Sequence, residues 1–287
     1  MACVLITGGT GLVGTAVKTL LEAKGYEVIL VSRSKMAVKG QAHWDIDAGT
    51  IDTTAIAAAD YIIHLAGAGV ADKRWSTARK QEILDSRTKS SALLVKALAE
   101  TPNKVKAVIS ASAIGWYGPD NNNGDNNNIA SQGFVETDPS YPDFLGTTCA
   151  AWEASIAPVT ANTNGLQKRL VCLRTGIVLS KQGGALKEFL KPLAVRMAAV
   201  LGNGKQMISW IDVRDLAKMF VYAIEHENLS GSYNAVAPSP VSNKTLTKTL
   251  ASVLYGKFYI TTSHNSYLGV VLFLAPQKRF INLGCAL

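Results

Sequence analysis

The chain has 287 residues, 48% of them apolar, which is enough to enclose one large α/β core and excludes a disordered or fibrous protein. Its 29 Lys and Arg residues exceed its 21 Asp and Glu residues, so the net charge is +8. Because the positive residues are scattered and never form a run of five, we expect a diffuse field that attracts small anions, with nucleic acid as a minor alternative.

The first predicted elements make one βαβ unit. Residues 3–7 are an unbroken apolar run, which is typical of a parallel strand covered on both faces. A glycine-rich turn leads from this run into a helical pattern that ends near Gly25, and a second apolar run follows at residues 27–31. Strand, turn, helix and strand within about 30 residues are the order of elements in a βαβ unit with parallel strands.

The alternation of strands and helices continues along the chain. Further strands are predicted at residues 61–65, 105–110, 169–174 and 232–235, and further helices at residues 78–99, 143–156, 186–199, 213–225 and 243–254. This alternation predicts an α/β fold with a Rossmann-type, doubly wound parallel sheet. Asp212 and Ser242 precede the last two helices as predicted N-caps. The asparagine-rich residues 119–131 predict a surface loop, and after Lys257 the pattern predicts no clear element.

Cysteine spacing and apolar runs bear on metal sites and location. The four cysteines show neither Cys-x-x-Cys spacing nor His partners, so we expect free thiols in a reducing compartment, no disulfide and no metal site. The first strand begins at about Ala2, which leaves no room for a signal peptide. The apolar run at residues 267–275 is about half of the ~20 residues that a membrane helix requires. We therefore expect a cytoplasmic protein with no membrane span.

The turn after the first strand has the spacing Gly-x-x-Gly-x-x-Gly. Glycines in such a turn let a pyrophosphate approach the backbone N–H groups at the start of the helix, because no Cβ is in the way. Glycine also serves ordinary tight turns, but the position between a predicted strand and a predicted helix favours dinucleotide binding. The predicted cofactor contacts in the turn are Gly8, Thr10, Gly11, Leu12, Val13 and Gly14.

The end of the second strand bears on the choice of cofactor. An acidic residue there binds the ribose 2′-hydroxyl of NAD, but this chain has Ser32 and Arg33 instead. A serine hydroxyl and a guanidinium suit a 2′-phosphate, so we predict NADP(H), with NAD(H) as the less favoured cofactor; a solvated basic loop is the alternative. Asp45, at the end of the expected third strand, is a candidate for the adenine amine or an ordinary turn residue.

Several motifs together resemble the extended short-chain dehydrogenase/reductases, and more narrowly their YfcH-type, NAD(P)-dependent epimerase-like group. The motifs are residues 8–14 (GGTGLVG), 64–67 (HLAG), 74–75 (RW), 85–87 (DSR), 110–118 (SASAIGWYG), 143–145 (DFL), 174–176 (RTG), 183–186 (GGAL) and 210–215 (WIDVRD). The resemblance covers about residues 2–255. It implies an NADP(H) cofactor and a smaller C-terminal lobe on the substrate side of the sheet.

The resemblance also assigns residues to the cofactor and to two regions of the chain. It implies that Leu65, Ala66 and Gly67 line the dinucleotide near its nicotinamide half, and that Arg174, Thr175 and Gly176 lie beside the nicotinamide. Small residues at a strand exit and an Arg held in a surface ion pair are the structural alternatives. The expected dinucleotide-binding domain is residues 1–174, with residues 208–236 packing back onto it, and the expected lobe is residues 175–207 and 237–287.

The catalytic pattern of the superfamily is altered in this chain. Typical members use a Tyr-x-x-x-Lys pair, in which the Tyr exchanges a proton with the substrate and the Lys lowers the pKa of that Tyr. The resemblance places Leu145 and Cys149 at these two positions and Arg87 where an asparagine is frequent. Ser112 and Tyr117 are the remaining candidates to polarise a substrate oxygen, with a strand-end cap and a packed ring as their structural alternatives.

Two functions fit this sequence. The first is an NADP(H)-dependent oxidoreductase or epimerase-like enzyme that acts on a small hydroxy or carbonyl compound. The second is a non-catalytic protein in which NADP(H) orders the loop around residues 119–133 and regulates a partner. Leu145 and Cys149 favour the second function, whereas the retained substrate-side motifs favour the first.

Overall fold

A computed structural model describes residues 1–34, 40–119, 133–163, 166–194 and 197–255 of the chain. Within these residues, eight strands form one sheet in the order β12-β7-β6-β5-β1-β2-β3-β4. Its strands are β1 (Cys3–Thr7), β2 (Glu27–Ser32), β3 (Gln41–Asp45), β4 (Thr50–Ile51), β5 (Tyr61–His64), β6 (Ala107–Ala113), β7 (Arg169–Thr175) and β12 (Gly231–Ala235). The pairs from β12 to β3 are all parallel, and only β4 pairs antiparallel with its neighbour.

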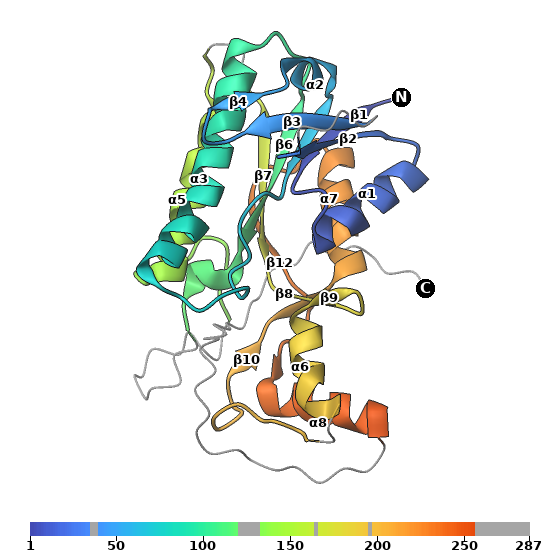
Figure 1. Cartoon of the computed structure of the whole chain (residues 1–287), viewed down its shortest axis with the longest axis vertical. Helices are drawn as coiled ribbons and strands as arrows, with labels where there is room; N and C mark the ends of the chain where they lie inside the picture. Colours follow the sequence, from blue (N-terminus) through green and yellow to red (C-terminus); the bar gives the residue numbers. More distant parts are fainter. Residues whose placement is uncertain (35–39, 120–132, 164–165, 195–196, 256–287) are drawn as a thin grey trace.

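Helices cover both faces of this sheet, as Figure 1 shows. Helices α1 (Leu12–Ala23) and α7 (Val213–Glu225) cover one face, and α2 (Thr53–Ala58), α3 (Thr77–Glu100) and α5 (Phe144–Ile156) cover the other. Strand β1 contributes to both layers, since Val4 and Ile6 pack with α1 and α7 whereas Leu5 packs with α3. The predicted doubly wound parallel sheet is therefore confirmed, and an uninterrupted apolar strand reflects burial on both sides.

A smaller part of the molecule follows β7 and lies below the large sheet in Figure 1. It contains the strands β8 (Ile177–Ser180), β9 (Gly183–Gly184), β10 (Met207–Ile208), β11 (Trp210–Asp212) and β13 (Val241–Ser242), with helices α6 (Ala185–Ala194) and α8 (Asn243–Tyr255). Two small apolar clusters of its own, one around Leu193 and Ala251 and one around Ile208 and Leu246, hold it together. This arrangement supports the expected lobe, whose boundaries stay a prediction.

Several predicted elements differ from the structure in their bounds. The strand predicted at residues 105–110 lies instead at Ala107–Ala113, because its pairing with β7 continues three residues further. The helix predicted at residues 186–199 ends at Ala194, soon after Pro192, and residues 197–199 are not helical. The asparagine-rich loop, and with it the regulatory loop of the second function, lies outside the described residues, as does the run at 267–275.

Candidate cofactor and substrate site

The glycine turn fits closely between β5 and the start of α1. Gly8 has a φ of +68°, and a Cβ at this position would lie 2.8 Å from the carbonyl carbon and oxygen of Leu65. A Cβ on Gly14 would lie 2.5 Å from the carbonyl oxygen of Gly8 and from the Cα of Gly9. Larger side chains would therefore push the turn away from the strand exit and from its own helix. These two glycines are needed by the backbone geometry before any ligand is considered.

The start of α1 is open to solvent. Its N-cap is Gly11, so no side chain caps the first turn within the described residues, and that turn carries no acidic residue. Thr10 and Gly11 are both exposed, and a Cβ on Gly11 would meet only the carbonyl oxygen of Gly8, at 3.3 Å. Uncapped N–H groups and the positive end of the helix dipole fit a phosphate. The geometry of the turn is thus compatible with the predicted dinucleotide, and Leu12 and Val13 begin the helix beside it.

The predicted ribose and adenine contacts lie at the same edge of the sheet. Ser32 ends β2 and its hydroxyl accepts a hydrogen bond from the N–H of Ser34 at 3.3 Å, while Arg33 is exposed beside it. Asp45 ends β3, where its Oδ1 accepts hydrogen bonds from the N–H groups of Asp47 and Ala48 at 3.1 and 3.0 Å. Asp45 therefore has a turn role, and its contact with an adenine stays a prediction.

Leu65 and Ala66 lie directly beside the glycine turn, and their contact with a dinucleotide stays a prediction. Their backbone N–H groups donate hydrogen bonds to the hydroxyl of Thr7, at 3.2 and 3.3 Å. Gly67 comes next, and a Cβ there would lie 3.2 Å from the guanidinium carbon of Arg87. The structure therefore brings the β5 exit and the turn together into one continuous surface.

The positions of the missing Tyr and Lys hold no group that titrates near neutral pH. Leu145 packs against Gly115, since a Cβ added to Gly115 would lie 3.2 Å from the Cβ of Leu145. Burial raises the pKa of the Cys149 thiol to about 12, so this thiol stays protonated and is not a nucleophile. The guanidinium of Arg87 stacks over the ring of Trp152, with its carbon 4.9 Å from the ring centroid, and donates a hydrogen bond to the carbonyl of Ala68 at 3.0 Å.

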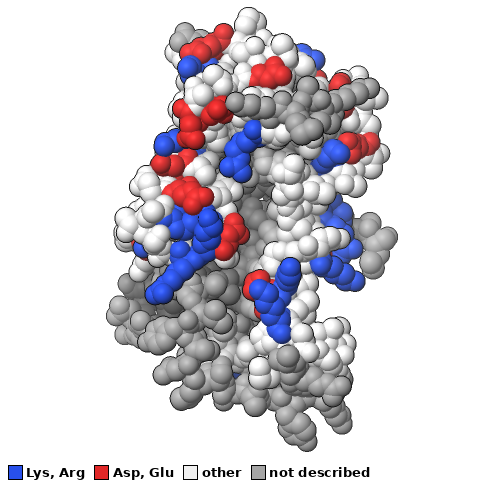
Figure 2. All heavy atoms as spheres, in the orientation of Figure 1, with Lys and Arg blue, Asp and Glu red and all other residues white. Residues whose placement is uncertain are grey.

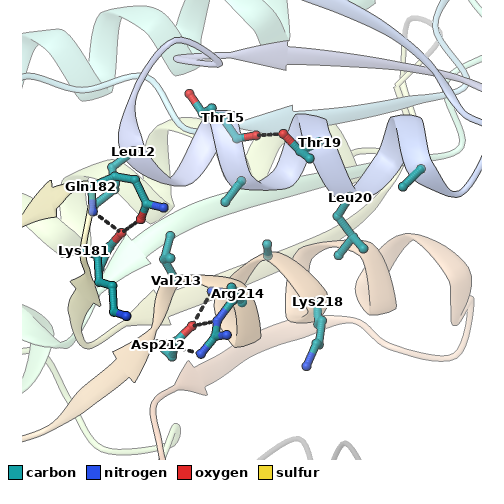
Figure 3. A pocket seen from close by; sticks show the side chains of 14 residues that line it. Leu12, Thr15, Thr19, Leu20, Lys181, Gln182, Asp212, Val213, Arg214 and Lys218 are labelled. Carbon is teal, nitrogen blue, oxygen red and sulfur yellow. Dashed lines mark hydrogen bonds and ion pairs between the residues drawn. The ribbon is translucent and has the colours of Figure 1, made fainter.

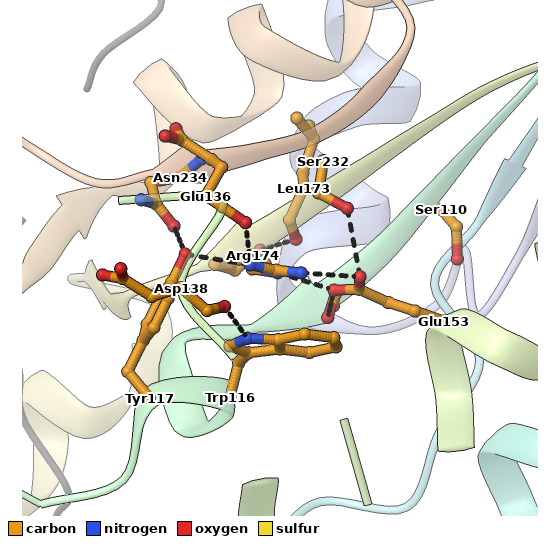
Figure 4. A network of polar contacts seen from close by, with 12 residues as sticks. Ser110, Trp116, Tyr117, Glu136, Asp138, Glu153, Leu173, Arg174, Ser232 and Asn234 are labelled. Atoms are coloured by element: carbon orange, nitrogen blue, oxygen red, sulfur yellow. Dashed lines mark hydrogen bonds and ion pairs between the residues drawn. The ribbon is translucent and has the colours of Figure 1, made fainter. Parts of the chain in front are cut away.

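A buried ion pair joins β7 to α5. Arg174 is 3% exposed, and its Nε and Nη2 donate to the two carboxylate oxygens of Glu153 at 2.8 and 3.0 Å. Burial opposes the charged guanidinium, but the hydrogen bonds and charge of Glu153 outweigh it and raise the pKa of Arg174. The hydroxyl of Ser112 donates to the same carboxylate at 2.6 Å, and the ring of Trp116 lies 3.6 Å from the guanidinium carbon (Figure 4).

Tyr117 belongs to this same network. It ends the short 3₁₀ helix Ile114–Tyr117 directly after β6. Its hydroxyl donates to Oδ1 of Asn234 at 2.7 Å and accepts from Arg174 at 3.0 Å (Figure 4). Desolvation raises the pKa of this phenol. Ser112 and Tyr117 are thus brought together, but each hydroxyl donates its hydrogen to a protein acceptor.

The remaining predicted residues of this motif are also enclosed. The N–H of Gly176 donates to the carbonyl of Ala235 at 3.0 Å, and a Cβ on Gly176 would lie 2.7 Å from the carbonyl oxygen of Ser209. The hydroxyl of Thr175 donates to the carbonyl of Leu173 at 3.1 Å. The sequence does not assign the pair of Arg174 with Glu153: a surface ion pair is the alternative expected for Arg174, whereas the pair is buried. A charged residue inside an apolar strand was its only sequence signal.

A separate pocket of about 690 Å³ lies between α1, α7 and the β8–β9 hairpin, as Figure 3 shows. Its walls include Leu12, Leu20 and Val213. The cations on its α7 side are paired on their own helix, because Arg214 binds Asp212 at 2.9 Å and Lys218 binds Asp215 at 3.0 Å. The walls of this pocket are mainly apolar, and the charged side chains on its α7 side are held in ion pairs.

On the face shown in Figure 2, Lys and Arg side chains form several separate groups and no continuous stripe. Among the described residues, no group of three or more His, Cys, Asp or Glu could hold a metal ion. No helix in the described ranges is long and apolar enough to cross a membrane.

Comparisons with known proteins agree with this geometry. The model of the NAD dependent epimerase/dehydratase family matches residues 4–236. An epimerase family protein of Mycobacterium bovis is 35% identical over 86% of this chain and 77% of its own length. The crystal structure of the human epimerase family protein SDR39U1 (isoform 2) with NADPH matches with a TM-score of 0.76 and 31% identity, covering 90% of this chain and 82% of that one.

A more distant structure shares the fold alone. MoeE5, in complex with UDP-glucuronic acid and NAD, matches with a TM-score of 0.72 at 20% identity, covering 92% of this chain and 86% of that one. The resemblance read from the sequence motifs is confirmed by these matches. Because the family model spans most of the chain and the Mycobacterium relative exceeds 30% identity, this protein belongs to the NAD dependent epimerase/dehydratase family.

Proposed function

We propose that this protein binds NADP(H) and acts as an oxidoreductase or epimerase-like enzyme on a small hydroxy or carbonyl compound in the cytoplasm. The observation that carries the proposal is the uncapped start of α1 behind an exposed glycine turn, with the guanidinium of Arg33 at the adjacent strand end. The human relative SDR39U1 was crystallised with NADPH, which supports this cofactor, whereas the distant MoeE5 holds NAD.

Each predicted contact has a role in this proposal. Backbone N–H groups at Leu12 and Val13 hold the pyrophosphate. Gly8, Thr10, Gly11 and Gly14 shape the turn, where the N–H of Gly11 donates to the carbonyl of Gly8 at 3.1 Å. Ser32 and Arg33 hold the 2′-phosphate, and Asp45 lies near the adenine. Leu65, Ala66 and Gly67 would line the nicotinamide half, and Arg174, Thr175 and Gly176 would lie beside the nicotinamide. The nicotinamide supplies or accepts a hydride when it is bound.

Ser112 and Tyr117 are the proposed substrate-polarising groups. To donate to a substrate oxygen, each hydroxyl has to give up the hydrogen bond that it donates within the protein. Ser112 donates to Glu153, and Tyr117 donates to Asn234. A water or the substrate itself is the other source of the proton, since Leu145 supplies none.

A second candidate function is a protein that binds NADP(H) without catalysis. It is favoured by the closed network around Glu153 and Arg174 and by the raised pKa of Cys149, which together leave no available acid or base at the usual positions. The absorbance of NADPH decides between the two functions when the protein is mixed with a panel of carbonyl compounds. Oxidation that requires the protein supports the enzyme, and no oxidation with any compound supports the binding protein.

The cofactor proposal is tested by Arg33→Glu. One charge-assisted hydrogen bond contributes about 1.5–3 kcal/mol, so the NADPH dissociation constant should rise about tenfold or more while that of NADH changes little. Lys248→Glu, an exposed position on α8, makes the same change in net charge and should alter neither constant. Equal losses for both cofactors would show that Arg33 does not recognise the 2′-phosphate.

A further inference from the structure

A chain of buried polar side chains runs from α3 to the glycine turn. Its members are Thr7, His64, Ser90 and Ser91, all with no exposed surface. The Oγ1 of Thr7 lies 2.7 Å from Nδ1 of His64, and Nε2 of His64 lies 3.1 Å from Oγ of Ser91 and 3.4 Å from Oγ of Ser90. The ring therefore bridges β1 and α3 with both of its nitrogens.

The α3 end of the chain fixes which nitrogen of His64 carries a hydrogen. The hydroxyl of Ser91 donates to the carbonyl of Arg87 at 2.9 Å, and the hydroxyl of Ser90 donates to the carbonyl of Ser86 at 2.7 Å. Each serine has a single hydroxyl hydrogen, so both oxygens are left to accept from the ring. Nε2 of His64 must therefore be the protonated nitrogen.

The other end of the chain gives the same answer. The Oγ1 of Thr7 accepts from the N–H of Ala66 and shares the N–H of Leu65 with the backbone carbonyl of Thr7, so its own hydrogen is left to donate to Nδ1 of His64. Burial lowers the pKa of His64 to about 3, which keeps the ring neutral. Only one tautomer satisfies the chain from both ends, and every hydrogen bond in it has one direction.

This ordered chain ends on the segment that lies beside the turn. Thr7 directly precedes Gly8. The N–H groups that donate hydrogen bonds to its hydroxyl belong to Leu65 and Ala66, directly after β5. A second set of contacts from α3 holds Ala68, whose N–H donates to Oγ of Ser86 at 2.9 Å and whose carbonyl accepts from Arg87 at 3.0 Å. Helix α3 thus contacts residues 65–68 in two ways, through the buried chain that ends at Thr7 and through Ser86 and Arg87.

We propose that Thr7 and neutral His64 are positioning residues for the nicotinamide half of the cofactor site, because their hydrogen bonds hold the backbone of Leu65 and Ala66 against the glycine turn. This inference rests on the proposed NADP(H) binding. It separates the site into two parts. The adenosine half depends on the ends of β2 and β3, whereas the nicotinamide half depends on a polar chain that originates in α3.

The test compares Thr7→Val with Thr7→Ser, using NADPH and adenosine 2′,5′-bisphosphate as ligands in calorimetry. Valine keeps the shape of Thr7 but leaves Nδ1 of His64 and the N–H of Ala66 without partners. Loss of these hydrogen bonds should raise the NADPH dissociation constant about tenfold or more, whereas that of the bisphosphate should stay within about twofold. Serine keeps the hydroxyl and should restore NADPH binding. Thr247→Val, also buried but in the smaller lobe, should change neither constant.

The outcomes separate this inference from the proposed function. If wild-type protein binds neither nicotinamide nucleotide, the proposed function fails and the inference fails with it. If Thr7→Val binds NADPH as wild type does, or weakens both ligands equally, the positioning role is overturned while NADP(H) binding stands. Nitrogen-15 NMR of wild-type His64 gives an answer even if Thr7→Val does not fold. The Nε2–H tautomer is expected, and an Nδ1–H tautomer or a protonated ring at pH 7 would overturn the chain.

Discussion

The glycine turn and the Glu153–Arg174 network lie at the same carboxyl edge of one parallel sheet, but they treat polar groups in opposite ways. At the turn, small residues leave backbone donors at the start of α1 without side-chain partners. In the network, the polar side chains from Ser112 through Glu153 and Arg174 to Tyr117 satisfy one another, whereas at its far end Nδ2 of Asn234 is buried without a partner among the described residues. A site with open donors is built to receive a ligand, whereas a closed network stabilises the fold.

The largest expected effect comes from opening the network. Glu153→Ala leaves the guanidinium of Arg174 buried without its partner, and breaking such a pair costs about 3–5 kcal/mol of unfolding free energy. Urea unfolding measures the loss. Glu188→Ala is the matched control, because its pair with Lys191 has both side chains 61% exposed and is worth about 0–1 kcal/mol. A loss below about 1 kcal/mol for Glu153→Ala would mean that the ion pair does not stabilise the fold.

Acid should weaken the fold through His64. The unfolded ring binds a proton below its ordinary pKa near 6.5, whereas burial lowers the folded pKa to about 3, with desolvation as the cause and no charged group contributing. The unfolded state therefore binds more protons between these values, and stability falls as pH falls by up to about 1.4 kcal/mol per unit. Unfolding free energies between pH 6.5 and 4.5 measure this slope. His64→Asn should flatten it, and an equal slope in both proteins would rule out His64 as its source.

The turn itself is tested by two alanine substitutions. Gly14→Ala places a Cβ 2.5 Å from the carbonyl oxygen of Gly8, so we expect about 1–3 kcal/mol of destabilisation and weaker NADPH binding. Gly183→Ala is the control, because a Cβ there meets no atom within 4 Å. Unfolding curves and calorimetry report both effects. Unchanged NADPH affinity in Gly14→Ala would argue that the cofactor does not use this turn.

The contrast between the two regions also explains what the sequence could predict. The long amphipathic helix α7 and the uninterrupted apolar strand β1 are predicted closely from the sequence. The predicted N-cap Asp212 is confirmed, because its carboxylate accepts a hydrogen bond from the N–H of Arg214. The short strands β8 to β11 were not predicted, because runs of two to four residues show too little periodicity.

The site shows the same division between local and tertiary features. The glycine turn is a local pattern within seven residues, so its place between β1 and α1 could be read directly from the sequence. The network could not, because Glu153 on α5 meets Arg174 on β7 only after the sheet and its covering helix have packed together. Ser112 and Tyr117 were selected by residue type, and only the structure assigns acceptors to their hydroxyls.

The smallest expected effect concerns Cys149, which takes the place of the usual lysine. Its thiol is 4% exposed and burial raises its pKa to about 12, so iodoacetamide at pH 8 should alkylate it only when the protein unfolds globally. Mass spectrometry of the Cys149 peptide measures the rate, which should rise in urea in step with the unfolded fraction. Cys149→Ala should then leave NADPH binding unchanged. Rapid alkylation of the folded protein would instead indicate an accessible thiolate, and the closed half of the site would have to be treated as chemically active.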